Sequence, residues 1–158
     1  MKRLVFSSCL IFKFFITSSL AYAGPTTDIP QLPKGYRAWS HTKSMVIPDK
    51  SHALYGFHNI YANPKATRGL LKKGGFENGS AFVVSFYDVV DKDGTVNQGA
   101  KTMDAVMIKD AKAKATGGWY YGVFQPNGKP KPINAAKDCF ECHKSVQDSD
   151  YVFHKFIR

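Results

Sequence analysis

The sequence predicts an α+β fold, in which an antiparallel β-sheet carries a few packed helices. Two segments are rich in β-branched and aromatic residues and end at turn residues: residues 81–90, before Asp-Lys-Asp-Gly, and residues 119–125, before Pro-Asn-Gly. Both are predicted to be strands. A helix start is also present, because Asn63 can cap a first turn and Pro64 suits the first helical position. Strands and short helices together indicate the α+β class.

The other elements follow in chain order. Mixed apolar and polar stretches predict strands within residues 36–47 and 54–61. The Asn-Pro start predicts a helix over residues 65–73, which ends at a Gly-Gly pair. Residues 103–114 have helical character, and a short helix is expected over residues 134–144. The chain contains no repeat or low-complexity block, so one domain is expected.

The last predicted helix contains the run Cys139-Phe140-Glu141-Cys142-His143. A Cys-x-x-Cys-His run in an exported chain predicts one covalently bound haem c, with each thiol added to a haem vinyl group. The histidine that follows is placed to ligate the iron. A zinc site would need a second ligand pair, and a redox Cys-x-x-Cys would need a thioredoxin-like context. A disulfide between Cys139 and Cys142 would not require His143. The C-terminal helix is therefore predicted to be a haem c attachment helix.

The N-terminus predicts export. Residues 1–23 combine a basic start, a mostly apolar stretch and an Ala-x-Ala cleavage pattern, which is typical of a cleaved signal peptide. Cleavage there would leave one domain over residues 24–158, with no membrane span and with the haem pair as its two cysteines. Covalent haem attachment outside the cytoplasmic membrane fits a bacterial periplasm.

The net charge of the chain bears on which classes of partner molecule it could bind. The full sequence has a formal net charge of +10, and removal of the three basic residues of the signal peptide leaves 19 basic against 12 acidic residues, or +7. A basic surface could steer an acidic redox partner protein, although a solvated basic face is the more ordinary explanation of the charge. The lysines are scattered and form no nucleic-acid-binding motif, so no nucleic-acid partner is expected.

The position of the motif separates classes of cytochrome. In small all-helical electron carriers the motif lies near the mature N-terminus, with a methionine ligand well downstream. Here 15 residues follow His143, and none is methionine. Four-helix cytochromes c′ also carry a late motif, but the strands predicted at residues 81–90 and 119–125 contradict a helical bundle. A methionine sixth ligand must therefore come from upstream, or there is none.

Other short motifs occur in a specific order and spacing. They are Leu32-Pro33-Lys34-x-Tyr36-Arg37-x-Trp39, Pro64 with Lys72-Lys73-Gly74, Asn78-Gly79-Ser80, Gly118-Trp119, Cys139-x-x-Cys142-His143-Lys144 and Asp150-x-Val152-Phe153-x-x-Phe156. Together they resemble the cytochrome P-460 family, which includes the β-sheet cytochromes c′ (cytochrome c′-beta). The resemblance covers nearly the whole mature chain. It implies a five-coordinate haem with a proximal histidine on an antiparallel sheet, usually in a homodimer, and either hydroxylamine oxidation or nitric oxide binding.

One position departs from the hydroxylamine-oxidising members, which carry a lysine on the main strand that cross-links to the porphyrin. The register from Gly79-Ser80 places Val84 there, and a valine cannot form that bond. Lys43 and Lys109 are possible substitutes. The departure favours the cytochrome c′-beta side, where phenylalanines cap an open iron face. Strand alternation places three side chains of the main strand on one face, and the preceding predicted strand adds one more. Each could equally be core packing. These cap candidates are Phe57, Phe82, Val84 and Phe86.

Polar candidates complete the expected site. Tyr120 follows Trp119 where some relatives place a residue over the distal face, so its hydroxyl could bond a nitrogen-oxide ligand. Arg37 could pair with a haem propionate. Several side chains could supply a sixth ligand, and all but His154 lie upstream of the motif: His41, His52, His58, His154, Met45, Met103 and Met107.

An apolar cap would favour neutral nitric oxide over anionic or strongly hydrated ligands, because nothing there would repay their desolvation. The expected function is therefore a cytochrome that binds nitric oxide or related nitrogen oxides. A hydroxylamine or nitric oxide oxidoreductase and a six-coordinate electron carrier are the alternatives.

Overall fold

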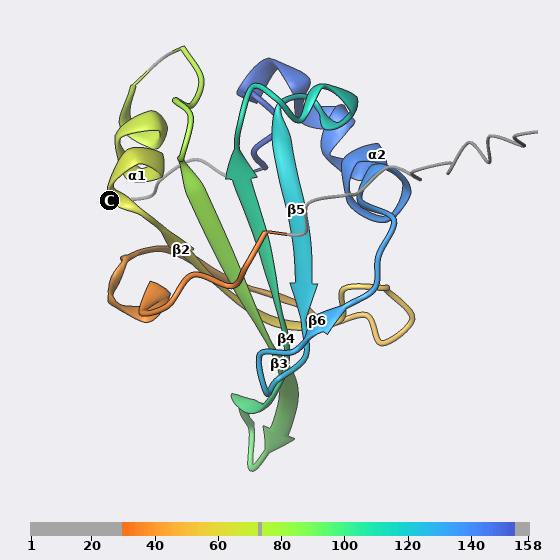
Figure 1. Ribbon diagram of the computed structural model, residues 1–158. Helices are drawn as coiled ribbons and strands as arrows, with labels where there is room; N and C mark the ends of the chain where they lie inside the picture. The colour runs from red at the N-terminus through yellow and green to blue at the C-terminus, as the bar shows by residue number, and fades with distance from the viewer. Residues whose placement is uncertain (1–29, 73, 154–158) are drawn as a thin grey trace, which may run out of the picture.

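A six-stranded antiparallel sheet is the centre of the computed structural model, which describes residues 30–72 and 74–153 (Figure 1). Its strands are β1 (Ser40–Ile47), β2 (Gly56–Ala62), β3 (Ala81–Lys92), β4 (Thr95–Lys109), β5 (Trp119–Phe124) and β6 (Pro130–Lys131). Each strand pairs with the next along the chain, so the sheet order is the chain order. The predicted α+β class is confirmed. The predicted signal peptide lies outside the described residues.

Short helical segments surround the sheet. They are η1 (Tyr36–Ala38), α1 (Pro64–Leu71), η2 (Lys114–Thr116), the π-helical η3 (Ala135–Phe140), α2 (Glu141–His143) and η4 (Lys144–Ser149). The predicted start of α1 is confirmed, since the Asn63 side chain accepts a hydrogen bond of 2.8 Å from the amide of Ala66. Asn134 caps η3 in the same way. No helix within the described ranges is long and apolar enough to cross a membrane.

The helix expected over residues 103–114 was wrong, because most of that segment belongs to β4. Asp104 and Val106 are buried, and they alternate with Met103, Ala105 and Met107, which are partly exposed. This alternation has the period of a strand, and β4 pairs with β3 on one side and β5 on the other. Hydrogen bonds to two neighbouring strands outweigh the helix propensity of methionine and alanine.

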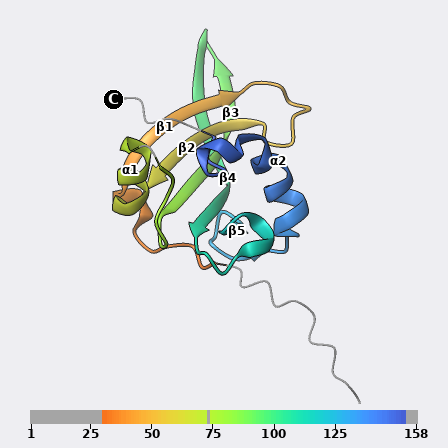
Figure 2. The same ribbon diagram turned by 90° about the horizontal axis from the view of Figure 1, so that it is seen from above.

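The sheet carries a separate hydrophobic cluster on each face. We call the face that includes Phe82, Trp119 and Tyr121 the inner face; α1 and the C-terminal helices pack on it. We call the face that includes Val83, Val106 and Phe124 the outer face; the segment around Tyr36 covers it. In Figures 1 and 2, α1 lies toward β2 while the C-terminal helices lie toward β5. The Cys-x-x-Cys-His run therefore belongs to the inner face.

Candidate haem site

The two cysteines of the run are supplied by consecutive helical segments. Cys139 lies in η3, where it is partly buried against the inner cluster, and Cys142 lies exposed in α2. Neither cysteine forms a disulfide within the described part of the chain. Burial raises the pKa of the Cys139 thiol to about 11, with the nearby Asp138 adding to the effect. Cys139 is thus a protonated thiol at neutral pH, and both sulfurs are available for covalent attachment.

His143 is oriented by a backbone carbonyl. Its Nδ1 lies 2.6 Å from the carbonyl oxygen of Tyr151, which can only accept, so Nδ1 carries the proton and donates. Burial lowers the pKa of His143, an effect that the bond to Tyr151 partly opposes. The neutral ring keeps a lone pair on Nε2, which is the atom left to bind a metal. Its ring lies 5.1 Å from the ring of Tyr121 and 5.0 Å from that of Phe153.

An apolar row crosses the middle of the inner face. Val84 of β3 pairs with Ala105 of β4, which pairs with Val123 of β5. All three side chains are only partly buried, whereas Ile60, which pairs with Val84 from β2, is buried. The polypeptide therefore leaves an apolar strip of its sheet incompletely covered, beside the cysteine–histidine run. Such a strip suits one side of a flat, apolar porphyrin.

Tyr121 supplies an unsatisfied polar group on the same face. Its side chain is 5 % exposed, and its hydroxyl has no hydrogen-bond partner among the described residues. Burial raises the pKa of this phenol, so it is a neutral donor. A buried hydroxyl without a partner costs free energy, so its position beside His143 fits a site that a further polar atom completes.

Tyr120, which the sequence suggested for this role, lies on the outer face, where it pairs with Ile108. Strand alternation could have identified its neighbour, because Tyr121 must share the side of Trp119. Phe57 is also on the outer face. It pairs with Tyr87, which shares the outer side of β3 with Val83. The structure does not bring Phe57 or Tyr120 to the haem run.

The other cap candidates do share the inner face. Phe82 is 2 % exposed and packs at the α1 end, with ring distances of 5.4 Å to Phe76 and 6.1 Å to Trp119. Phe86 packs against His58, at a ring distance of 4.4 Å. Val84 lies between them and is the partly exposed member of the three. The two phenylalanines thus border the apolar row, and Val84 forms part of it.

The possible substitutes for the cross-linking lysine have different environments. Lys109 forms an ion pair of 2.5 Å with Asp150 and lies over the ring of Trp119. Lys43 pairs with Ile60 at the β1 edge of the inner face. The proposed propionate partner Arg37 donates to the Tyr87 hydroxyl at 2.9 Å, on the outer face, and so is not brought to the haem run.

The candidate sixth ligands are also distributed over the molecule. His58 is buried on the inner face and donates from Nε2 to the carbonyl of Leu54 at 2.8 Å. His41 pairs with Tyr61, on the outer side, and His52 lies in the loop before β2. The strand pairing places three methionines on the inner face: Met45, Met103 and Met107. His154 lies outside the described residues.

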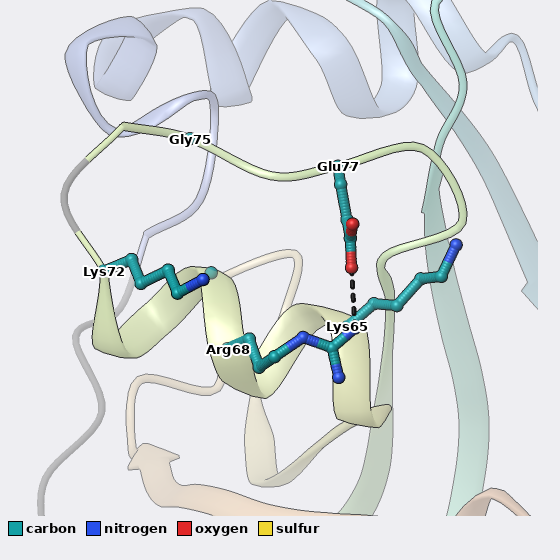
Figure 3. Close-up of a pocket in the computed structure, with 6 residues that line it drawn as sticks. Lys65, Arg68, Lys72, Gly75 and Glu77 are labelled. Atoms are coloured by element: carbon teal, nitrogen blue, oxygen red, sulfur yellow. Dashed lines mark hydrogen bonds and ion pairs between the residues drawn. The ribbon is translucent and has the colours of Figure 1, made fainter.

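A separate pocket lies on the exposed side of α1. It is lined by Lys65, Arg68, Gly69, Lys72, Gly75 and Glu77 (Figure 3). Glu77 reaches from the following loop to Arg68 at 2.7 Å, and both side chains are more than half exposed. An exposed pair of this kind adds little stability.

Two free thiols, a neutral histidine oriented through Nδ1, an uncovered apolar strip and an unsatisfied phenol fit a covalently bound haem. Fold and site thus define a haem c cytochrome built on an antiparallel sheet. The family profile described as Cytochrome P460 matches residues 33–154, and the chain belongs to that family. Membership implies covalently bound haem c, and the cysteines lie in the C-terminal helical region as expected. A search among curated proteins found no match.

Proposed function

We propose that this protein is a periplasmic cytochrome that binds nitric oxide, or a related neutral nitrogen oxide, at the open face of one haem c. Cys139 and Cys142 would hold the haem, and His143 would ligate its iron. The bound haem would supply an iron with one coordination position free for a small ligand.

His143 would keep its ring in one orientation through the bond from Nδ1 to the Tyr151 carbonyl. A histidine that donates its second ring proton to an acceptor becomes a more basic ligand at Nε2. The low proton affinity of the buried ring keeps it in the neutral form that can bind a metal.

The apolar character of the inner face carries the proposal. By the register that the family resemblance implies, Val84 stands where the hydroxylamine-oxidising members carry the cross-linking lysine, and Phe82 and Phe86 flank it on the same face. An apolar wall imposes a desolvation cost on anionic and strongly hydrated ligands, whereas neutral nitric oxide avoids most of it.

The location of the carboxylates supports binding over oxidation. Oxidation of hydroxylamine needs a proton acceptor near the iron. Asp104, which is fully buried at the centre of the sheet, faces the outer side and bonds Tyr36 and Ser85 there. Asp150 lies at the edge of the inner face, where Lys109 and the amide of Phe76 already engage its two oxygens.

Spectra of the haem-loaded protein would test the proposal. The ferrous protein should be high-spin and five-coordinate, should bind nitric oxide readily, and should turn over hydroxylamine slowly or not at all with an electron acceptor present. Rapid hydroxylamine turnover with a red-shifted, cross-linked haem band would instead establish an oxidoreductase, and Lys43→Met would then be the first variant to examine. A six-coordinate low-spin spectrum would establish an electron carrier.

Location and assembly belong to the same proposal. The predicted signal peptide would place the mature chain, of net charge +7, in the periplasm, and the family resemblance suggests a homodimer. Intact mass of the exported protein should correspond to a chain that starts near Gly24 with one haem added. Light scattering of that protein should give twice the mass.

A further inference from the structure

We infer that the ion pair between Lys109 and Asp150 is a positioning device that holds the Tyr151 carbonyl against His143 and thereby sets the strength of the histidine–iron bond. This inference rests on the proposed ligation of iron by His143. It assigns a role to two residues at a distance in sequence from the cysteine–histidine run.

Asp150 joins three separate parts of the chain. One carboxylate oxygen pairs with Nζ of Lys109, at the end of β4, at 2.5 Å. The other accepts from the amide of Phe76 at 2.9 Å, and the main-chain carbonyl accepts from Nε1 of Trp119 at 3.0 Å. The Lys109 and Asp150 side chains are only 15 % and 18 % exposed. Partial burial makes this pair stronger than a surface pair, because water screens it less.

The backbone at Asp150 and Tyr151 is held in an unfavourable conformation. Their φ angles are +50° and +65°, so two consecutive non-glycine residues lie in the left-handed region. Each such residue costs roughly 1–3 kcal/mol and persists where its surroundings determine it. Aspartate tolerates this region, but tyrosine does so poorly. The contacts of the Asp150 side chain offset this strain.

The result of this turn is the direction of one carbonyl. The amide of Tyr151 bonds the Val146 carbonyl at 3.1 Å, and the Tyr151 carbonyl meets Nδ1 of His143 at 2.6 Å. A path of direct contacts therefore runs from Lys109 through Asp150 and Tyr151 to His143. Loss of the ion pair should let the turn relax and lengthen the last bond, which would make His143 a weaker donor of electron density to iron.

Two substitutions test the inference with opposite changes of charge. Asp150→Asn removes a negative charge but keeps an acceptor for the Phe76 amide and tolerates the left-handed backbone. Lys109→Met removes a positive charge. In the haem-loaded protein, both should lower the iron–histidine stretching frequency in the resonance Raman spectrum and raise the reduction potential. Lys109→Arg should restore both towards the native values.

A purely electrostatic effect would differ. It would raise the potential in Asp150→Asn, lower it in Lys109→Met and leave the stretching frequency unchanged, which would overturn the positioning role. Arg68→Met is the matched control, because it breaks the exposed Arg68–Glu77 pair and should change neither quantity. Circular dichroism would confirm that each variant is folded.

Failure of the inference can be distinguished from failure of the proposed function. An iron–histidine band that is present in the native protein and unmoved in both variants overturns the positioning role alone. A native protein without that band, or one whose band survives in His143→Gly, overturns the ligation by His143 and the inference with it.

Discussion

The two faces of the sheet differ sharply at adjacent positions of the same strands. The row Ser85, Asp104 and Phe124 on the outer face is 0–2 % exposed, whereas the row Val84, Ala105 and Val123 on the inner face is partly exposed. Tyr36 covers the outer row, where its hydroxyl lies 2.9 Å from both Ser85 and Asp104. No equivalent cover from the described residues closes the inner row.

This difference shows which part of the core the polypeptide completes by itself. On the outer face, even a buried carboxylate has partners, because Asp104 also accepts from Ser85 at 2.7 Å and pairs with Lys101 at 2.5 Å. On the inner face, the phenol of Tyr121 is buried without a partner among the described residues. We attribute the contrast to the haem, which would complete the inner face.

The largest effect should come from removal of the haem attachment. Cys139→Ala with Cys142→Ala should abolish covalent haem, because no thiol remains to bond it. Haem staining after denaturing electrophoresis and intact mass would measure the loss. Glu141→Ala, between the two cysteines, is the control and should keep the haem. Retention of covalent haem by the double variant would contradict attachment at Cys139 and Cys142, and with it the placement of the haem on the inner face.

Two phenylalanines of equal burial compare the faces directly. Phe82 on the inner face and Phe124 on the outer face are each 2 % exposed, so alanine at either site should cost about 3–5 kcal/mol of unfolding free energy. Urea unfolding would measure this cost. Only Phe82→Ala should also change the affinity or rate of nitric oxide binding. An equal change in Phe124→Ala would mean that the two faces do not differ in function.

Two tyrosines compare a paired with an unpaired hydroxyl. Tyr36→Phe removes a donor to the buried Asp104 and should cost about 1–3 kcal/mol. Tyr121→Phe should not lower the unfolding free energy, since it removes a buried hydroxyl that has no described partner. A cost for Tyr121→Phe as large as that for Tyr36→Phe would identify a bond that the haem or bound water supplies.

The smallest effect should be a dependence on pH. Burial lowers the pKa of His58 on the inner face, so its stabilising contribution is complete above the unfolded pKa of about 6.5. The unfolded state binds the proton more readily, and stability should therefore fall as the pH drops from 7 towards 5. Urea midpoints of His58→Gln should fall less steeply over that range. The exposed His41→Gln should keep the native slope; equal slopes in all three proteins would contradict this origin.

Local patterns predicted much of this molecule. The Cys-x-x-Cys-His run, the Asn63 cap and the β-rich segment at residues 81–90 each depend on neighbouring residues, and the cap, the strand and the α+β class are confirmed. The order of short motifs also indicated the family that the profile match establishes. Such features can be recognised from sequence because a cap or a strand requires particular side chains at fixed, short spacings.

Tertiary structure decided which side chains meet. A shift of one residue in a strand moves a side chain to the other face, and so Tyr121 rather than Tyr120 lies beside His143. Sheet pairing on both sides similarly made β4 a strand where local propensity favoured a helix. The bond from His143 to the Tyr151 carbonyl depends on a left-handed turn that contacts from distant Lys109, Phe76 and Trp119 hold. No local spacing encodes such contacts, because they form only when the sheet and the C-terminal segment pack together.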